Sequence, residues 1–235
     1  MDKLIFNPKN HTYTIDGKKL TGVTTILSVI SKPALISWSA NCAVDYIDAK
    51  LPVKRDKNTL KVDADDFKSI LEQARKAHTV KRDKAGDIGT LVHKQIEKWI
   101  NGEPIDKMTL QAQKMFRNFT NWATENKVKF LASERQVYSE KHFFAGTYDF
   151  LCKMDGKIFL GDIKTGSRIY PEHLAQCAAY QICEEEMNET KINGHIIVNL
   201  KKDGTIQTKT NYDFNGYKKM FLSALVIYRQ LKNND

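Results

Sequence analysis

The sequence lacks several features that would place a protein in a class at once. No stretch of its 235 residues approaches the ~18 consecutive apolar residues of a membrane-spanning helix. The opening MDKLIFNPKN has neither the apolar core of a secretory signal nor the Arg/Ser-rich pattern of an organellar one. We therefore expect a soluble cytoplasmic protein with no membrane contact. Its compact size and lysine-rich composition suggest a phage source, which would place it in the host cytoplasm.

Cysteine is scarce and unclustered. The four cysteines, Cys42, Cys152, Cys177 and Cys183, form no Cys-x-x-Cys pair, which argues against a zinc finger. Two of them lie in apolar stretches, as small core residues do, so we expect reduced structural thiols. A Gly-rich phosphate loop is also missing, which leaves a sugar- or nucleotide-binding α/β domain without support.

Basic residues are in excess. Lys and Arg number 37 against 28 Asp and Glu, a formal charge of +9. Such a balance favours a polyanionic partner, with nucleic acid the first candidate, although many basic proteins bind nothing anionic.

Apolar periodicity and turn residues predict a helical first half and a sheet-rich second half. A small hairpin with turns at Asn7-Pro8 and Asp16-Gly17 comes first. We expect helices over 33–50, 63–80, 86–102, 108–126, 171–187 and 216–232, and strands over 130–140, 143–154, 157–166, 195–200 and 205–212. This order predicts one α/β domain over residues 1–235. Residues 1–127 form its hairpin and helical segment, and residues 128–235 form its sheet core.

Three charged residues interrupt the predicted hairpin GTYDFLCKMDGKIFLGDIKTG. A two-residue turn at Asp155-Gly156 pairs Met154 with Lys157 and places Asp149 directly opposite Asp162, with Cβ atoms roughly 5 Å apart. Lys164 lies two residues beyond Asp162 and therefore projects from the same face. A longer loop would shift this pairing.

Two facing carboxylates repel each other unless a cation lies between them. Hard divalent ions bind to one or two carboxylates together with water and phosphate oxygens, and a neighbouring lysine stabilises charge on a phosphate. The Asp149, Asp162 and Lys164 arrangement therefore favours metal-assisted hydrolysis of phosphodiesters. The alternative is an exposed sheet face with a salt bridge between Lys164 and one acid, which the apolar flanks disfavour.

GTYD and GDIKTG, followed by QCAAY, resemble the PD-(D/E)XK nuclease superfamily in its RecB-like exonuclease branch. GTLVH, VTTILSVISKPALISW and RDKAGDIGTLVHKQIEKWING resemble mitochondrial genome maintenance exonucleases and their phage relatives. The resemblance spans most of residues 20–185 and implies a restriction-endonuclease-like core with a central mixed sheet flanked by helices. Tyr148 stands where the motif has Pro. Too few late cysteines are present for an iron–sulfur cluster, so none is expected.

The resemblance assigns roles to individual residues. His93, Asp149, Asp162 and the Ile163 carbonyl would bind one or two Mg²⁺ or Mn²⁺ ions. An imidazole ligand makes tolerance for Mn²⁺ an expectation. The catalytic set would be Lys164, Asp162, Asp149 and Glu134, where Glu134 is otherwise an ordinary strand-edge charge. Gln176 and Tyr180, which share a helix face, would contact DNA or orient the lysine.

Other candidates rest on weaker patterns. The basic run before the His93 helix, with Lys81 and Arg82, would follow phosphates or would form an ordinary solvated face. Thr165 would donate to a phosphate or belong to a turn. Glu97, one turn after His93, would orient a ligand or lie in solvent. Three tryptophans at helical core spacing are expected to be buried rather than to stack on bases: Trp38, Trp99 and Trp122.

The sequence thus predicts a metal-dependent DNA exonuclease acting on single strands or free ends. Two rivals remain open. One is a flap or other structure-specific endonuclease of the same fold. The other is a non-catalytic DNA-binding subunit in recombination or replication, which the complete Asp149, Asp162 and Lys164 set disfavours. A recombination or replication protein is a further possible partner.

Overall fold

The structure, a computed structural model, describes residues 4–51 and 62–232. The chain divides into two compact units. The larger one combines the residues up to Ile30 with those from Gly89 onward, and the smaller one is Ser31–Ile88.

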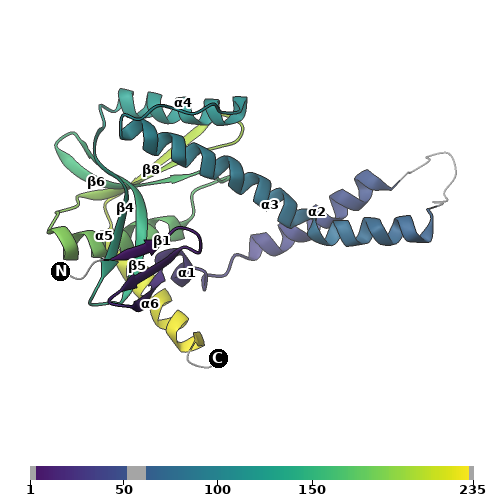
Figure 1. The fold of residues 1–235 in the computed structure, drawn as a ribbon, viewed down its shortest axis with the longest axis horizontal. Coiled ribbons are helices and arrows are strands. Elements are labelled where there is room, and N and C mark those ends of the chain that lie inside the picture. The colour runs from purple at the N-terminus through teal and green to yellow at the C-terminus, as the bar shows by residue number, and fades with distance from the viewer. Residues whose placement is uncertain (1–3, 52–61, 233–235) are drawn as a thin grey trace. The chain divides into compact units, whose positions relative to one another are not determined.

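One mixed eight-stranded sheet organises the described part of the larger unit (Figure 1). Its order is β1-β2-β3-β5-β6-β7-β8, and β4 pairs with β5 beside this path. The strands are β1 Ile5–Asn7, β2 Thr12–Ile15, β3 Lys18–Gly22, β4 Lys129–Ser139, β5 Phe144–Met154, β6 Lys157–Lys164, β7 Gly194–Leu200 and β8 Ile206–Asn211. The predicted mixed sheet flanked by helices is confirmed.

Strand β5 is the centre of the sheet. It pairs antiparallel with both β4 and β6, and its first residues pair parallel with the end of β3. Helix α5 (Pro171–Asn188) connects β6 to β7, which are parallel, as a crossover connection requires. Strand β8 pairs antiparallel with β7, and a final helix, α6 (Phe214–Lys232), completes the order expected for the second half of the chain.

Helices cover both faces of this sheet. Helices α1 (Val23–Leu27), α5 and α6 supply one apolar core, which includes Leu151 and Leu160 from the hairpin strands. On the other side, α4 (Leu110–Glu125) and the end of α3 contribute rings to an aromatic cluster of Trp99, Phe116, Phe119, Trp122, Phe130 and Phe150. Trp122 is therefore buried as predicted, whereas Trp99 packs against the same rings but is only partly buried.

The smaller unit pairs α2 (Pro33–Lys50) with the first part of α3 (Ala64–Ile100). Pro33 stands in the first turn of α2, where a missing N–H costs nothing. Tyr46 donates a hydrogen bond to Gln73, and the Trp38 ring contacts His78. Trp38 is nevertheless 38% exposed, so its predicted burial is wrong.

Helix α3 corrects one predicted boundary. Residues 63–80 and 86–102 were expected to form separate helices, whereas α3 is continuous from Ala64 to Ile100. Gly86 and Gly89 each weaken the helix by only ~1 kcal/mol relative to alanine, which does not break it. The helix ends just before Gly102, whose φ of +73° is the left-handed conformation typical of a helix stop.

The expectations about the cysteines and about membrane-spanning segments can be compared with the structure. All four cysteines are buried and free. Across the described ranges, none of the helices is both long enough and apolar enough to cross a membrane.

A buried histidine links α5 to the far strands of the sheet. His195 on β7 has no exposed surface, and its Nε2 lies 2.7 Å from Gln181 Oε1 of α5. Asn211 of β8 lies 3.4 Å from the other ring nitrogen. Burial lowers the pKa of His195 to about 4, so the ring stays neutral in the folded protein.

This burial predicts a loss of stability in acid. Between pH ~6.5 and ~4 the unfolded chain protonates His195 and the folded chain does not, so stability falls as pH decreases through that window. Glutamine cannot titrate. Between about pH 7 and pH 4, the free energy of unfolding of the His195→Gln variant should therefore fall by roughly 3 kcal/mol less than that of the native chain. Urea unfolding at both pH values measures this. Identical pH dependence of the two proteins would contradict it.

Candidate active site

The hairpin of β5 and β6 has the predicted register. Met154 pairs with Lys157, and the pairing continues as far as Phe150 with Gly161. Asp155 and Gly156 both have positive φ, +46° and +77°, as the expected two-residue turn requires. The pairing stops one position before the two acids. There the Asp149 carboxylate accepts a hydrogen bond from the backbone N–H of Ile163. Asp149 is thus held against the segment that carries Asp162.

Asp162 and Lys164 form a buried ion pair. Lys164 Nζ lies 2.7 Å from Asp162 Oδ1, and the Asp162 side chain is only 2% exposed. Lys164 also donates to Gln176 Oε1 on α5 at 3.1 Å, and Gln176 Nε2 donates to the Tyr180 hydroxyl at 2.9 Å. The two residues lie on one helix face as predicted, and they hold the lysine in place. Because Tyr180 is 3% exposed, its position suits an orienting role better than contact with a ligand.

Glu134 enters the site from β4. Its neighbours Ser133 and Arg135 pair with Phe150 and Tyr148, so Glu134 stands at the position opposite Asp149. The backbone of Glu134 is left-handed, with φ of +46°, inside an extended strand. Non-glycine residues adopt this conformation rarely and at a cost, and such strain is concentrated at functional sites. The strand is therefore distorted at the residue that brings this carboxylate to Asp149.

His93 reaches the same place from the end of α3. Buried Val92 and Ile96 on either side anchor this part of the helix. A side chain on Gly89, one turn earlier, would place its Cβ 2.8 Å from Thr165 Oγ1, so Thr165 would have to move, and glycine leaves room for α3 beside the end of β6. His93 Nδ1 lies 3.5 Å from Asp149 Oδ1. The Gly-Thr-Leu-Val-His spacing is thus a packing requirement as well as a motif.

These side chains form a ligand set that suits a metal ion. His93, Glu134 and Asp149 each offer a ligand atom, and these atoms all lie within 4.8 Å of one another. An imidazole with carboxylates suits Mn²⁺ and, through the oxygens, Mg²⁺. Asp162, expected as a ligand, is not in this group, and Lys164 occupies its Oδ1. Its Oδ2 is buried and finds no hydrogen-bond partner within the described ranges.

The electrostatics of the site show an excess of negative charge. Burial, reinforced by the charge of Asp149, raises the pKa of Glu134 to about 8, and burial raises that of Asp162 to about 6 despite Lys164. Burial opposes the charged form of Asp149, but His93, Lys164 and the Ile163 N–H together outweigh burial and lower that pKa. The pKa of His93 is raised, since Asp149 outweighs burial. The raised pKa values mean that protons bind to these carboxylates and reduce their mutual repulsion. A bound cation would reduce the same repulsion without protonation.

Several other predicted residues have clear positions. Thr165 lies beside Gly89, and Glu97 is half-buried with a charge that helps to raise the pKa of Glu134. Lys81 and Arg82 belong to the smaller unit, where they form ion pairs with Asp45 and Asp83. These pairs do not test a phosphate-binding role for either residue, which remains a prediction. The role of the Ile163 carbonyl likewise remains a prediction.

A buried glutamate behind the site was missed. Glu184 of α5 has no exposed surface and accepts hydrogen bonds from Arg135 at 3.0 Å and from the Tyr148 hydroxyl at 3.2 Å. These two donors pair with each other across β4 and β5 and directly adjoin Glu134 and Asp149. The sequence held a signal, because Glu184 follows Gln176 and Tyr180 at four-residue intervals on the same helix face.

Asn199 of β7 was also missed. It pairs with Lys164 across the parallel strands, it is fully buried, and neither polar atom of its side chain has a hydrogen-bond partner in the described structure. In the run HIIVNL, Asn199 and His195 are the two polar departures from an apolar strand.

Comparisons with known proteins place few constraints on this site. The sequence matches no protein-family model and no curated protein. Among solved structures, SSO0001 is similar over 48% of this chain and 57% of its own, with 13% identity and a TM-score of 0.31. This chain thus spans little more than half the length of that protein. An alkaline exonuclease, LHK-Exo from Laribacter hongkongensis, is similar over 60% of this chain and 82% of its own, at 13% identity and a TM-score of 0.33. Likeness this weak transfers no activity.

Proposed function

We propose that this chain is a divalent-metal-dependent deoxyribonuclease that degrades DNA from single-stranded or free ends. The observation that carries the proposal is the meeting of His93, Glu134 and Asp149 beside the buried Asp162–Lys164 pair. Four separate segments, α3, β4, β5 and β6, bring these residues together. The chain's charge of +9 suits a polyanionic substrate.

The residues of the candidate site would have different roles. His93, Glu134 and Asp149 would hold the Mg²⁺ or Mn²⁺ ion, with Asp162 beside them. When bound, such an ion supplies a Lewis acid for a phosphate and lowers the pKa of a nearby water. The chain itself contributes position and charge: Gln176 fixes the lysine, and burial keeps bulk water away from Asp162.

Lys164 has one donor left for the reaction. An ammonium group has three N–H donors, and Asp162 and Gln176 accept two of them. The third is available for a phosphate oxygen or for the attacking water. Burial lowers the pKa of Lys164, but the carboxylates of Asp162 and Asp149 outweigh it and raise that pKa, so the group stays cationic. It therefore acts by stabilising negative charge on the phosphate rather than as a base.

A comparison of substrates tests the function. Linear single-stranded DNA, linear duplex and closed circles are incubated with Mg²⁺, with Mn²⁺ and with EDTA. We expect nucleotides to be released from linear substrates, faster with Mn²⁺ because His93 is a ligand, and no reaction in EDTA. Cleavage of closed circles would contradict an exonuclease. Flap cleavage without end degradation would identify the endonuclease rival, and DNA binding without any cleavage would identify the non-catalytic one.

A further inference from the structure

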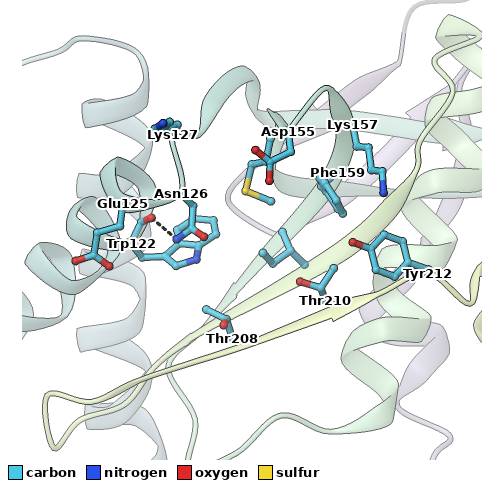
Figure 2. Close-up of a pocket in the computed structure, with 12 residues that line it drawn as sticks. Trp122, Glu125, Asn126, Lys127, Asp155, Lys157, Phe159, Thr208, Thr210 and Tyr212 are labelled. Atoms are coloured by element: carbon cyan, nitrogen blue, oxygen red, sulfur yellow. Dashed lines mark hydrogen bonds between the residues drawn. The ribbon is translucent and has the colours of Figure 1, made fainter.

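A pocket with a volume of about 460 Å³ lies in the larger unit (Figure 2). It is separate from the candidate metal site, because His93, Glu134 and Asp149 do not line it. Its size is that of a small-ligand site. Three elements enclose it: the end of α4, the tip of the β5–β6 hairpin, and strands β7 and β8. The lining residues are Trp122, Glu125, Asn126, Lys127, Met154, Asp155, Lys157, Phe159, Ile196, Thr208, Thr210 and Tyr212.

Tyr212 is the exposed ring of the pocket lining, because Trp122 and Phe159 are only 8% and 4% exposed, and the rim carries charged side chains. Tyr212 is 63% exposed, which is unusual for a ring beside a cavity, and its ring stands edge-on to Phe159. Lys157 Nζ lies 5.5 Å from the centre of the Tyr212 ring. In Figure 2, Trp122 and Asn126 lie on the opposite side of the pocket from Tyr212.

These groups match one class of ligand. A planar, uncharged ring would stack on Tyr212. The amide of Asn126 and the hydroxyls of Thr208 and Thr210 can hydrogen-bond to donors and acceptors on the edge of that ring. The end of α4 and the hairpin tip each carry one lysine and one acid, and β7 and β8 carry no charge, so the rim has no net charge and suits a ligand with a single phosphate better than a polyphosphate.

We propose that this pocket binds one nucleotide of a DNA strand, with its base on Tyr212 and its phosphate at Lys157. The proposal rests on the nuclease function above and deepens it. Along the hairpin, Asp155 lies six residues from Asp149, about 20 Å of extended strand. A strand engaged at the metal cluster would cover that length with about six nucleotides at the ~3.4 Å spacing of duplex DNA, and with fewer when stretched.

The first test locates the DNA without requiring cleavage. The full-length protein in EDTA is irradiated with a single-stranded oligonucleotide of about 12 nucleotides that carries 4-thiothymidine, and the linked peptides are identified by mass spectrometry. We expect linkage to the peptides that contain Tyr212 or Trp122. Linkage confined to other peptides would overturn the proposal.

The second test measures affinity for the same oligonucleotide by fluorescence anisotropy. Tyr212→Ala should weaken binding about 10-fold, whereas Tyr212→Phe should retain it, because stacking needs only the ring. Lys157→Gln should weaken binding about 3-fold. Lys232→Gln is the matched control, since Lys232 lies 5.6 Å from the Tyr228 ring but lines no part of this pocket. Equal affinity of Tyr212→Ala and the native chain would overturn the proposal.

The two proposals fail in different ways. A protein that links to DNA through the pocket but cleaves no substrate would support the nucleotide site and contradict the nuclease. A protein that degrades linear DNA with no linkage at the pocket would support the nuclease and contradict the nucleotide site.

Discussion

Lys164→Met should lower the rate of DNA cleavage by about 1,000-fold at saturating substrate. The ammonium group lies on the hairpin beside the candidate metal ligands, and it is already oriented by Asp162 and Gln176. Its loss removes stabilisation of negative charge on the phosphate, which the substrate needs more in the transition state than in the ground state. The effect should therefore appear in kcat, with KM little changed. Steady-state kinetics on a linear single strand measure both.

The control for this variant is Lys153→Met. Lys153 is a solvent-exposed lysine on β5 of the same hairpin and lies in neither the candidate metal site nor the pocket. The Lys153→Met protein should therefore cleave DNA at the native rate. Lys164→Met leaves Asp162 buried without its ion pair, so thermal unfolding of each variant must accompany the kinetics. A folded Lys164→Met protein with native kcat would refute the assignment of this site.

The hairpin was predictable because its geometry is local. The Asp-Gly dipeptide selects a two-residue turn, the turn sets the register, and the register brings Asp149 to the strand that carries Asp162. The same reasoning gave Lys164 its place beside Asp162, and the 2.7 Å ion pair confirms it. The alternative considered, an exposed salt bridge, is correct about the ion pair but not about its exposure, because Asp162 is 2% exposed and Lys164 22% exposed.

The ligand set depended on longer-range packing and was harder to predict. Nothing local to Glu134 shows that its backbone turns left-handed, or that β4 aligns it with Asp149. His93 comes from the distant helix α3, which packs closely against Thr165 at Gly89. The sequence resemblance nominated both residues. The geometry in addition places Glu134 in the ligand group and Asp162 in an ion pair, a distinction that no motif contains.

Glu184→Ala should lower the free energy of unfolding by about 3 kcal/mol. The substitution leaves the hydroxyl of the fully buried Tyr148 without its hydrogen-bond acceptor, and it removes the carboxylate that Arg135 contacts. Urea unfolding measures the loss. Glu72→Ala is the control, because Glu72 is an exposed glutamate in the interior of a helix and should change stability by less than about 0.5 kcal/mol.

The same substitution should also weaken the metal site. Arg135 and Tyr148 adjoin Glu134 and Asp149 along their strands, so the Glu184 carboxylate contacts the two strands that carry these candidate ligands. We expect Mn²⁺ affinity, measured by calorimetry on folded protein, to fall about 10-fold, as when partners behind metal ligands are lost. Adding Tyr148→Phe to Glu184→Ala removes the stranded hydroxyl and should recover stability but not affinity. Equal recovery of both would show that Glu184 acts on the fold alone.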